Sequence, residues 1–310
     1  MIRSLLIALS QSNAFRRFVV AFPLSRRVSR RFVAGERLAE GLAAVQRLNQ
    51  RGLLATFDLL GENVHSADHA IAAANDYIQI LNAIAERHLC SNISLKLTQM
   101  GLAVDAELCV NNLRRILAQA RRHGNFVRLD MEGSVYTQRT LDIYDRLRAE
   151  GFDNTGVVIQ AYLYRSEDDI RRLAECGAKV RLCKGAYAEP PSIAFPSKAD
   201  VDANYHRLVE IMWSEQALAK GAVAALATHD EQIIRWAKDE AARRGIAKDR
   251  FEFQMLYGIR AQRQAQLAAE GHRFRVYVPF GAQWYPYFMR RLAERPANMI
   301  FLIRNLFRSS

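Results

Sequence analysis

The sequence predicts an α/β protein of the (β/α)8 type, a TIM-like barrel with an N-terminal helical arm. One unit repeats eight times from residue 52 onward: a short apolar run, a polar or glycine-containing loop, and an amphipathic stretch at helical spacing. The chain has 310 residues, and a barrel of this type takes about 250, which leaves room for segments at both ends.

The predicted strands are the apolar runs of this repeat. They cover residues 53–57, 93–97, 126–129, 157–161, 180–183, 223–227, 251–256 and 274–278. Strands that are apolar on both faces and separated by helices form parallel sheets, and right-handed crossovers close such units into a barrel. An open doubly wound sheet is the alternative, but no GxGxxG motif follows the first strand.

Six of the eight predicted helices begin at Ser, Thr or Asp, and several end at Gly, as helix caps require. They cover residues 66–89, 105–123, 137–151, 166–177, 200–221, 230–245, 259–271 and 283–294. The chain therefore divides into an N-terminal basic arm (1–50), the barrel (51–298) and a C-terminal amphipathic tail (299–310).

The two ends of the chain are basic and amphipathic. No acidic residue precedes Glu36, and the apolar run 5–9 is too short to span a bilayer. Both ends read as helices lying on an anionic membrane surface or, alternatively, as helices packed on the barrel. The composition of the N-terminal stretch is also typical of a transit peptide.

The formal net charge of +12 permits nucleic acid, anionic lipid or an acidic substrate as partner, or reflects only a solubilising surface. The body of the chain contains no dense basic tract with interleaved aromatic residues, so no nucleic acid is expected. None of the four cysteines forms a CxxC pair, which indicates a reducing compartment.

Polar side chains follow or end nearly every predicted strand, where barrel enzymes place their active sites. In chain order they are Asp58, Glu62, Lys96, Asp130, Gln160, Arg181, Lys184, Thr228, His229, residues 254–257 and Tyr277. Charges at such positions need partners, and we expect Lys96 and Asp130 to partly neutralise each other. A purely structural ion pair at the barrel mouth is the alternative to a catalytic role.

Two further groups are candidates for binding an anion. Arg290 and Arg291 offer several planar donors to one carboxylate, unless they form an exposed basic pair. The loop Gly185-Ala186 follows two cations and has the composition of a phosphate-binding loop. His65 and His69 lie one helical turn apart with no third ligand at useful spacing, so no metal site is expected.

At these strand ends the chain resembles the proline dehydrogenase family over roughly residues 50–300. The stretches that carry the resemblance are FDLLGE (57–62), NISLKLTQMGL (92–102), VRLDMEGS (127–134), VRLCKGAYAEP (180–190), ATHD (227–230), FEFQMLYGIR (251–260) and VYVPFGAQWYPYFMRRLAERPAN (276–298). Cys183 stands where the family usually has Val. The length is similar to the short bacterial monofunctional form.

The resemblance implies a role for each matching residue. Lys96, Arg290 and Arg291 match positions that bind the proline carboxylate, Tyr277 matches a residue near the ring, and Glu62 matches the acidic partner of a substrate-binding arginine. Asp130 and Arg181 match active-site positions, with Arg181 beside the N5 atom of the flavin. The positions that match FAD contacts are Gln160, Arg181, Lys184, Gly185, Ala186, Thr228 and His229.

The implied activity is FAD-dependent oxidation of L-proline to Δ1-pyrroline-5-carboxylate, the first step of proline catabolism, by hydride transfer to the flavin. The electrons would then pass to membrane quinone, and the product to a separate pyrroline-5-carboxylate dehydrogenase. The expected location is the cytoplasm, peripherally on the inner face of the membrane. Two alternatives are a flavin barrel enzyme that prefers hydroxyproline and a non-enzymatic basic module that binds lipid or nucleic acid.

Overall fold

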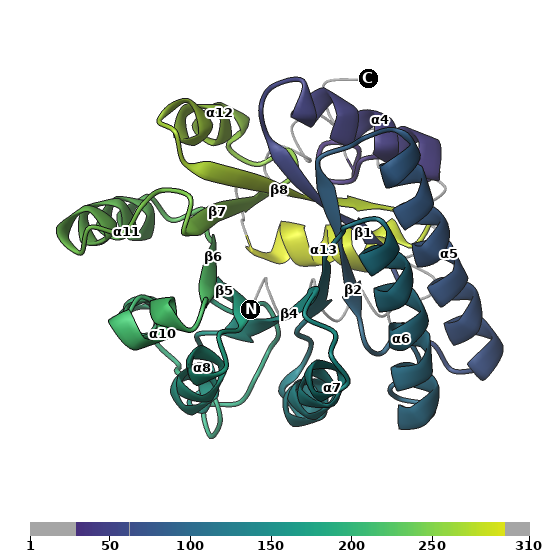
Figure 1. Cartoon of the computed structure of the whole chain (residues 1–310), viewed down its shortest axis with the longest axis horizontal. Helices are drawn as coiled ribbons and strands as arrows, with labels where there is room; N and C mark the ends of the chain where they lie inside the picture. The colour runs from purple at the N-terminus through teal and green to yellow at the C-terminus, as the bar shows by residue number, and fades with distance from the viewer. Residues whose placement is uncertain (1–28, 62, 295–310) are drawn as a thin grey trace, which may run out of the picture.

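A computed structural model of the chain describes residues 29–61 and 63–294. Within these residues, parallel strands pair in chain order and the last strand pairs with the first, so the sheet closes into a barrel (Figure 1). The strands are β1 Leu54–Leu59, β2 Ser91–Lys96, β3 Val127–Asp130, β4 Thr155–Gln160, β5 Lys179–Cys183, β6 Val223–Ala227, β7 Phe251–Leu256 and β8 Arg273–Phe280. The predicted (β/α)8 barrel is confirmed.

The helices follow the strands as the capping signals indicate. They are α4 Leu38–Asn49, α5 Ala67–Glu86, α6 Ala106–Arg122, α7 Thr137–Ala149, α8 Ser166–Glu175, α9 Lys198–Met212, α10 Glu215–Ala219, α11 Glu231–Arg243, α12 Ala261–Ala269 and α13 Trp284–Glu294. Ser66 and Asp105 cap α5 and α6 by accepting backbone N–H groups from His69 and Leu108. A single 3-10 turn, Ser134–Tyr136, precedes α7.

The predicted helix 200–221 is in fact two helices, which corrects that expectation. After α9 ends at Met212, the Ser214 hydroxyl accepts the N–H of Ala217 at 3.3 Å and caps α10 as a new helix. Asp200 does not begin α9; it lies in the first turn, and Ser197 is the N-cap residue. A serine inside an apparently continuous helical pattern was the signal that would have predicted the break.

Helix α4 lies in the outer layer of the barrel, where it packs against β1 and β8 (Figure 1). Its Gly41 faces Phe57 of β1, whose ring stacks on Phe280 of β8 at 4.2 Å. Residues 38–49 of the predicted arm thus belong to the wall of the barrel. The remainder of the arm before residue 29 and the predicted tail 299–310 lie outside the described residues.

Helix α13 has a different place from the other helices that follow strands. Figure 1 draws it across the centre of the barrel, and three of its residues line the same cavity as the strand ends: Tyr287, Arg290 and Arg291. Because α4 fills the outer layer beside β8 and β1, α13 covers the mouth instead. In the described part of the chain, no helix combines the length and apolar character needed to cross a membrane.

The barrel interior contains a layer of buried, paired charges beneath the mouth. Arg275 of β8 bonds Glu252 of β7 at 2.9 Å and donates to the carbonyl of Ala55 at 2.7 Å. Arg128 of β3 donates to the carbonyl of Val157 at 3.1 Å. Each of these contacts links two different strands, so the charges help to fix the closure of the barrel as well as filling it.

The packing of α4 gives a testable prediction at Gly41. A Cβ atom at this position would lie 2.4 Å from Cζ of Phe57. We expect Gly41→Ala to lower the free energy of unfolding. Overpacking usually costs about 1–3 kcal/mol, and the higher helix propensity of alanine offsets about 1 kcal/mol of that cost. Urea denaturation followed by circular dichroism measures the change.

A Phe57→Leu background is the control for this prediction. Leucine lacks the ring atom that the new methyl group meets, so Gly41→Ala should cost less there. An equal loss in both backgrounds would show that Phe57 is not the contact that requires glycine.

Candidate active site

The strand ends and α13 enclose a cavity of about 690 Å³ at the C-terminal face of the barrel. Its lining includes most of the described residues that the sequence singled out at the strand ends, but not Asp58 or Tyr257. Those that line it include Lys96, Asp130, Gln160, Arg181, Lys184, Gly185, Ala186, Thr228, His229, Tyr277, Arg290 and Arg291. The remaining candidate, Glu62, lies outside the described residues.

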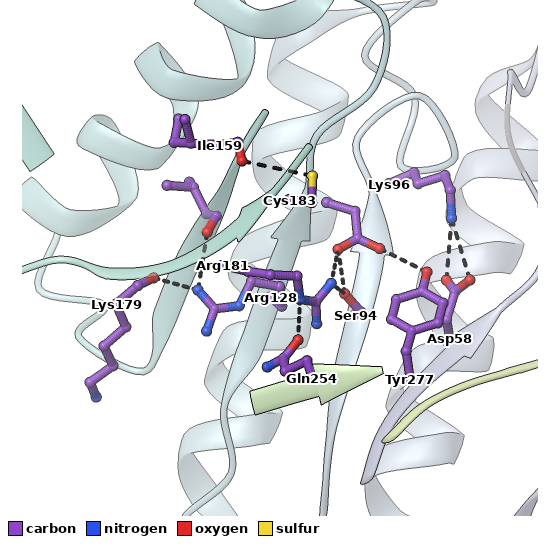
Figure 2. Close-up of polar contacts among 12 residues, drawn as sticks. Asp58, Ser94, Lys96, Arg128, Ile159, Lys179, Arg181, Cys183, Gln254 and Tyr277 are labelled. Carbon is purple, nitrogen blue, oxygen red and sulfur yellow. Dashed lines mark hydrogen bonds and ion pairs between the residues drawn. The ribbon is translucent and has the colours of Figure 1, made fainter. Parts of the chain in front are cut away.

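The centre of the site is the buried carboxylate of Asp130, at the end of β3. Its Oδ1 accepts from Arg181 Nη1 and from the Ser94 hydroxyl, both at 2.6 Å, and its Oδ2 accepts from the Tyr277 hydroxyl at 2.9 Å. Arg181 also donates from Nε to Gln254 at 2.6 Å (Figure 2). One carboxylate therefore ties together side chains from β2, β5 and β8.

Arg181 retains one donor that no described residue accepts. Its Nη2 is buried and has no hydrogen-bond partner among the described side chains or backbone. A buried guanidinium nitrogen without an acceptor is costly, and Arg181 lines the cavity. Arg181 therefore keeps one donor that no described protein group uses, in a side chain at the cavity wall.

Lys96 has a different partner from the one expected. We predicted that Lys96 and Asp130 partly neutralise each other, but each has its own partner of opposite charge: Asp130 pairs with Arg181, and Lys96 Nζ lies 3.3 Å from Asp58 (Figure 2). Strand β1 continues past Phe57 to Leu59, so Asp58 lies inside the strand. Its position next to the predicted strand was the signal that pointed to it, but not to its partner.

Asp58 is a fully buried carboxyl group beneath the cavity. Burial raises the pKa of Asp58, and the charge of Lys96 opposes that rise. The hydroxyl of Tyr77, from α5, donates to the carboxylate at 3.3 Å. Asp58 thus holds the ammonium group of Lys96 at the floor of the site without lining the cavity itself.

Tyr277 presents a neutral phenol to the site. Burial raises the pKa of Tyr277 well above its ordinary value, so the hydroxyl stays protonated and serves as the donor to Asp130. The guanidinium of Arg181 lies 5.2 Å from the centre of the ring, at the distance of a cation–π contact. The ring is therefore fixed from its face and from its hydroxyl end.

The cation of Lys184 is already neutralised by protein carboxylates. Its Nζ lies 2.5 Å from Asp202 and 2.7 Å from Asp230. Burial acts to raise the pKa of Asp230, but hydrogen bonds from Lys184 and Lys198 hold the pKa well below its usual range. The expected phosphate loop therefore brings less free positive charge than its sequence indicated.

The loop after β5 requires glycine at residue 185. Gly185 has φ +122, and a Cβ atom there would lie 2.3 Å from the ring of Tyr162. The backbone of the loop can therefore lie directly on the tyrosine only because residue 185 has no side chain. This close packing fixes the wall that Gly185 and Ala186 contribute to the cavity.

His229 is held by the backbone in one tautomer. Its Nε2 accepts the N–H of Leu256 at 3.0 Å, which leaves the proton of the neutral ring on Nδ1. Arg260, in a left-handed conformation at φ 53, donates to the His229 carbonyl at 2.6 Å and pairs with Glu231 at 2.7 Å. Sequence reasoning missed Arg260, because its distance from His229 along the chain gives no signal.

Comparison with known proteins identifies relatives of this chain. A family model described as proline dehydrogenase matches residues 41–304. Proline dehydrogenase 1 of Bacillus subtilis (strain 168) is 43% identical over 308 residues, which cover 99% of this chain and 100% of the relative. Proline dehydrogenase of Deinococcus radiodurans is 43% identical over 285 residues, which cover 91% of this chain and 90% of the relative.

Solved structures agree in fold. Proline utilization A (PutA) from Bdellovibrio bacteriovorus, inactivated by N-propargylglycine, superposes with a TM-score of 0.80 at 26% identity. The match covers 86% of this chain and 32% of the PutA chain, so it involves one part of that longer protein.

The cysteines give a prediction that depends on the pKa and the exposure of each thiol. Burial raises the pKa of Cys109 and of the half-buried Cys183 to about 12, whereas Cys90 and Cys176 are exposed. At pH 8 only about one in ten thousand of the Cys109 and Cys183 thiols is ionised, and the fraction rises with pH toward 12. Iodoacetamide at pH 8 should therefore modify Cys90 and Cys176 and spare the other two, as peptide mapping reads out.

The same labelling in 8 M urea, where all four thiols should react, is the control. Modification of Cys183 at the rate of Cys90 in the folded protein would contradict the prediction. This comparison is informative because Cys183 lines the cavity.

Proposed function

The chain belongs to the proline dehydrogenase family, and on that premise we propose that it oxidises L-proline to Δ1-pyrroline-5-carboxylate with FAD as cofactor. The observation that carries the proposal is the meeting of three cationic side chains with the buried Asp130–Arg181 pair in one cavity: Lys96, Arg290 and Arg291. Proline is a zwitterion whose carboxylate calls for such cations, and its small ring leaves the rest of the cavity for a cofactor.

The residues present fit a flavin. The cavity volume of about 690 Å³ is in the range of cofactor sites, the loop at Gly185 presents bare backbone, and the buried Nη2 of Arg181 lacks a protein acceptor. We assign FAD contacts to Gln160, Arg181, Lys184, Gly185, Ala186, Thr228 and His229. When bound, FAD supplies the hydride acceptor for the reaction.

The protein contributes orientation and charge. In the proposed site, Arg290 and Arg291 from α13 and Lys96 from the floor hold the substrate carboxylate, and Tyr277 lies near the ring. Fixing the substrate in this way converts hydride transfer into a nearly unimolecular step. Arg181 lines the cavity, where its guanidinium would stabilise negative charge that develops during the reaction.

Glu62 completes the proposal at the substrate end. It matches the acidic partner of a substrate-binding arginine, and the described backbone ends at Gly61 on one side and resumes at Asn63 on the other. The N–H of Asn63 donates to Thr98 at 3.1 Å, and Thr98 in turn bonds Glu132 beneath the loop. We propose that Glu62 pairs with an arginine of α13.

The expected test is an anaerobic absorbance spectrum of the protein before and after addition of L-proline. The wild type should show flavin bands that bleach with proline, because hydride transfer reduces the cofactor. Arg291→Met should keep the bands and raise the proline concentration needed for bleaching by about 100-fold, since a charged hydrogen bond to a carboxylate is worth about 1.5–3 kcal/mol. Arg235→Met, an exposed arginine of α11, is the matched control and should behave as wild type.

Other outcomes of this experiment identify the alternatives. Flavin bands that bleach with hydroxyproline and persist with proline would support the flavin cofactor and identify hydroxyproline, in place of proline, as the substrate. If the protein showed no flavin bands even after FAD is supplied, the proposed flavin-dependent activity would be contradicted. A basic module that binds lipid or nucleic acid would then be favoured.

We further propose that the electrons pass to a membrane quinone, that a separate pyrroline-5-carboxylate dehydrogenase takes the product, and that the protein sits peripherally on the inner face of the membrane. The support is the net charge of +12 together with the basic stretches at both ends of the sequence.

Co-sedimentation with vesicles of phosphatidylcholine and phosphatidylglycerol tests the membrane proposal. The full chain should pellet with the vesicles and be released by salt, and variants lacking residues 1–28 or 299–310 should pellet less. Vesicles of phosphatidylcholine alone are the control. Equal pelleting of the full and shortened chains would end this proposal.

A further inference from the structure

Helix α13 brings the two proposed carboxylate-binding arginines to the cavity, so its placement sets theirs. Unlike the helices of the outer layer, α13 lies over the barrel mouth (Figure 1). Its Tyr287, Arg290 and Arg291 line the cavity. The contacts that fix α13 therefore matter for substrate binding.

The residues before α4 form such contacts. Segment 29–36 is tied to the end of β8 by two backbone hydrogen bonds, from Ala34 N–H to the Pro279 carbonyl at 2.8 Å and from Gly281 N–H to the Gly35 carbonyl at 2.9 Å. Strand β8 leads directly into α13. The segment thus clamps the short connection between the last strand and α13.

Segment 29–36 also contacts the side chains of α13. Phe32 packs against Phe288 with ring centres 6.4 Å apart, and Phe288 meets the edge of Trp284 at 5.7 Å. The indole Nε1 of Trp284 donates to Oε1 of Glu36 at 3.0 Å. Trp284 is only 2% exposed, so its N–H needs an acceptor, and Glu36 supplies a charged one.

The same segment reaches the loop after β7. Gly258 has φ +73, and a Cβ atom there would lie 1.6 Å from the carbonyl oxygen of Arg31. Two residues earlier, Leu256 lines the cavity. Segment 29–36 therefore joins α13, the end of β8 and a loop of the cavity wall.

We propose that Glu36 and Trp284 are a positioning pair that holds α13 over the barrel mouth and thereby sets the affinity for the substrate carboxylate. Neither residue lines the cavity, so both act through Arg290 and Arg291. The inference rests on the proposed function for its kinetic consequence, but the docking of α13 is a separate physical statement that can be measured without substrate.

The expected kinetic effect is on KM. The arginines bind the carboxylate equally in the ground state and the transition state, so a poorly placed α13 weakens binding and leaves the chemical step nearly unchanged. When only a fraction of molecules has α13 docked, the apparent dissociation constant rises by the inverse of that fraction. Breaking a hydrogen bond to a charged acceptor should make local opening of α13 more frequent by about tenfold or more.

The experiment compares four variants of the full chain with wild type. Trp284→Phe removes the indole N–H and keeps an aromatic ring, Glu36→Ala removes the acceptor, and Glu36→Gln keeps an acceptor oxygen at the same distance. Trp213→Phe is the matched control, because Trp213 is also 2% exposed and its Nε1 hydrogen-bonds no described residue. Each protein is measured by hydrogen exchange of the 284–291 amides and by KM and kcat for L-proline.

The proposal expects about tenfold faster exchange in α13 for Trp284→Phe and Glu36→Ala, a KM that rises by at most the same factor, and a kcat changed by less than about twofold. Glu36→Gln should restore most of both, and Trp213→Phe should match wild type. The proposal would be overturned if the α13 amides of Trp284→Phe exchanged at the wild-type rate. It would also be overturned if Trp213→Phe accelerated their exchange as much as Trp284→Phe does. If wild type does not turn over proline, the proposed function fails, and the exchange rates alone decide the positioning pair.

Discussion

The architecture of the mouth depends on one buried carboxylate. Asp130 accepts hydrogen bonds from Arg181, Ser94 and Tyr277, which come from three other strands. A charge in this low-dielectric position is tolerable only when fully bonded, and its donors meet only if the barrel closes in the observed register. The same bonds that satisfy Asp130 leave one buried nitrogen of Arg181 without a described hydrogen-bond partner. The stability of the closed barrel and the preparation of the site are thus consequences of a single arrangement.

Several cations at the cavity are paired with protein carboxylates, which the overall excess of arginine in the sequence does not reveal. On the β5 side, Lys184 faces two aspartates and contributes little net field. At the floor, Lys96 is balanced by Asp58. Arg181 is likewise paired with Asp130. Three cations at the strand ends therefore each have a protein carboxylate as partner.

The sequence was sufficient for the barrel and for the prediction that most candidate residues line one cavity, because both follow from local patterns. Apolar runs alternate with amphipathic stretches, and parallel strands bring their C-terminal ends to one face whatever their exact limits. The sequence did not predict which side chains pair with one another across the barrel. In the sheet, Lys96 lies opposite Asp130, whereas Asp58 lies opposite Ser94, and only the side-chain geometry pairs Lys96 with Asp58. The places of α4 and α13, and the contact of Glu36 with Trp284, join segments about 250 residues apart, for which a single sequence carries no pattern.

The placement of α4 between β1 and β8 also determines the order in which the molecule can assemble. The helix precedes every described strand, yet it packs against the last strand as well as against the first. Contacts of such sequence separation make folding slow, and during synthesis the apolar face of α4 must wait until β8 has left the ribosome. Until then the nascent barrel has two open edges and an unprotected helix, so this protein should need chaperone protection over nearly its whole translation time.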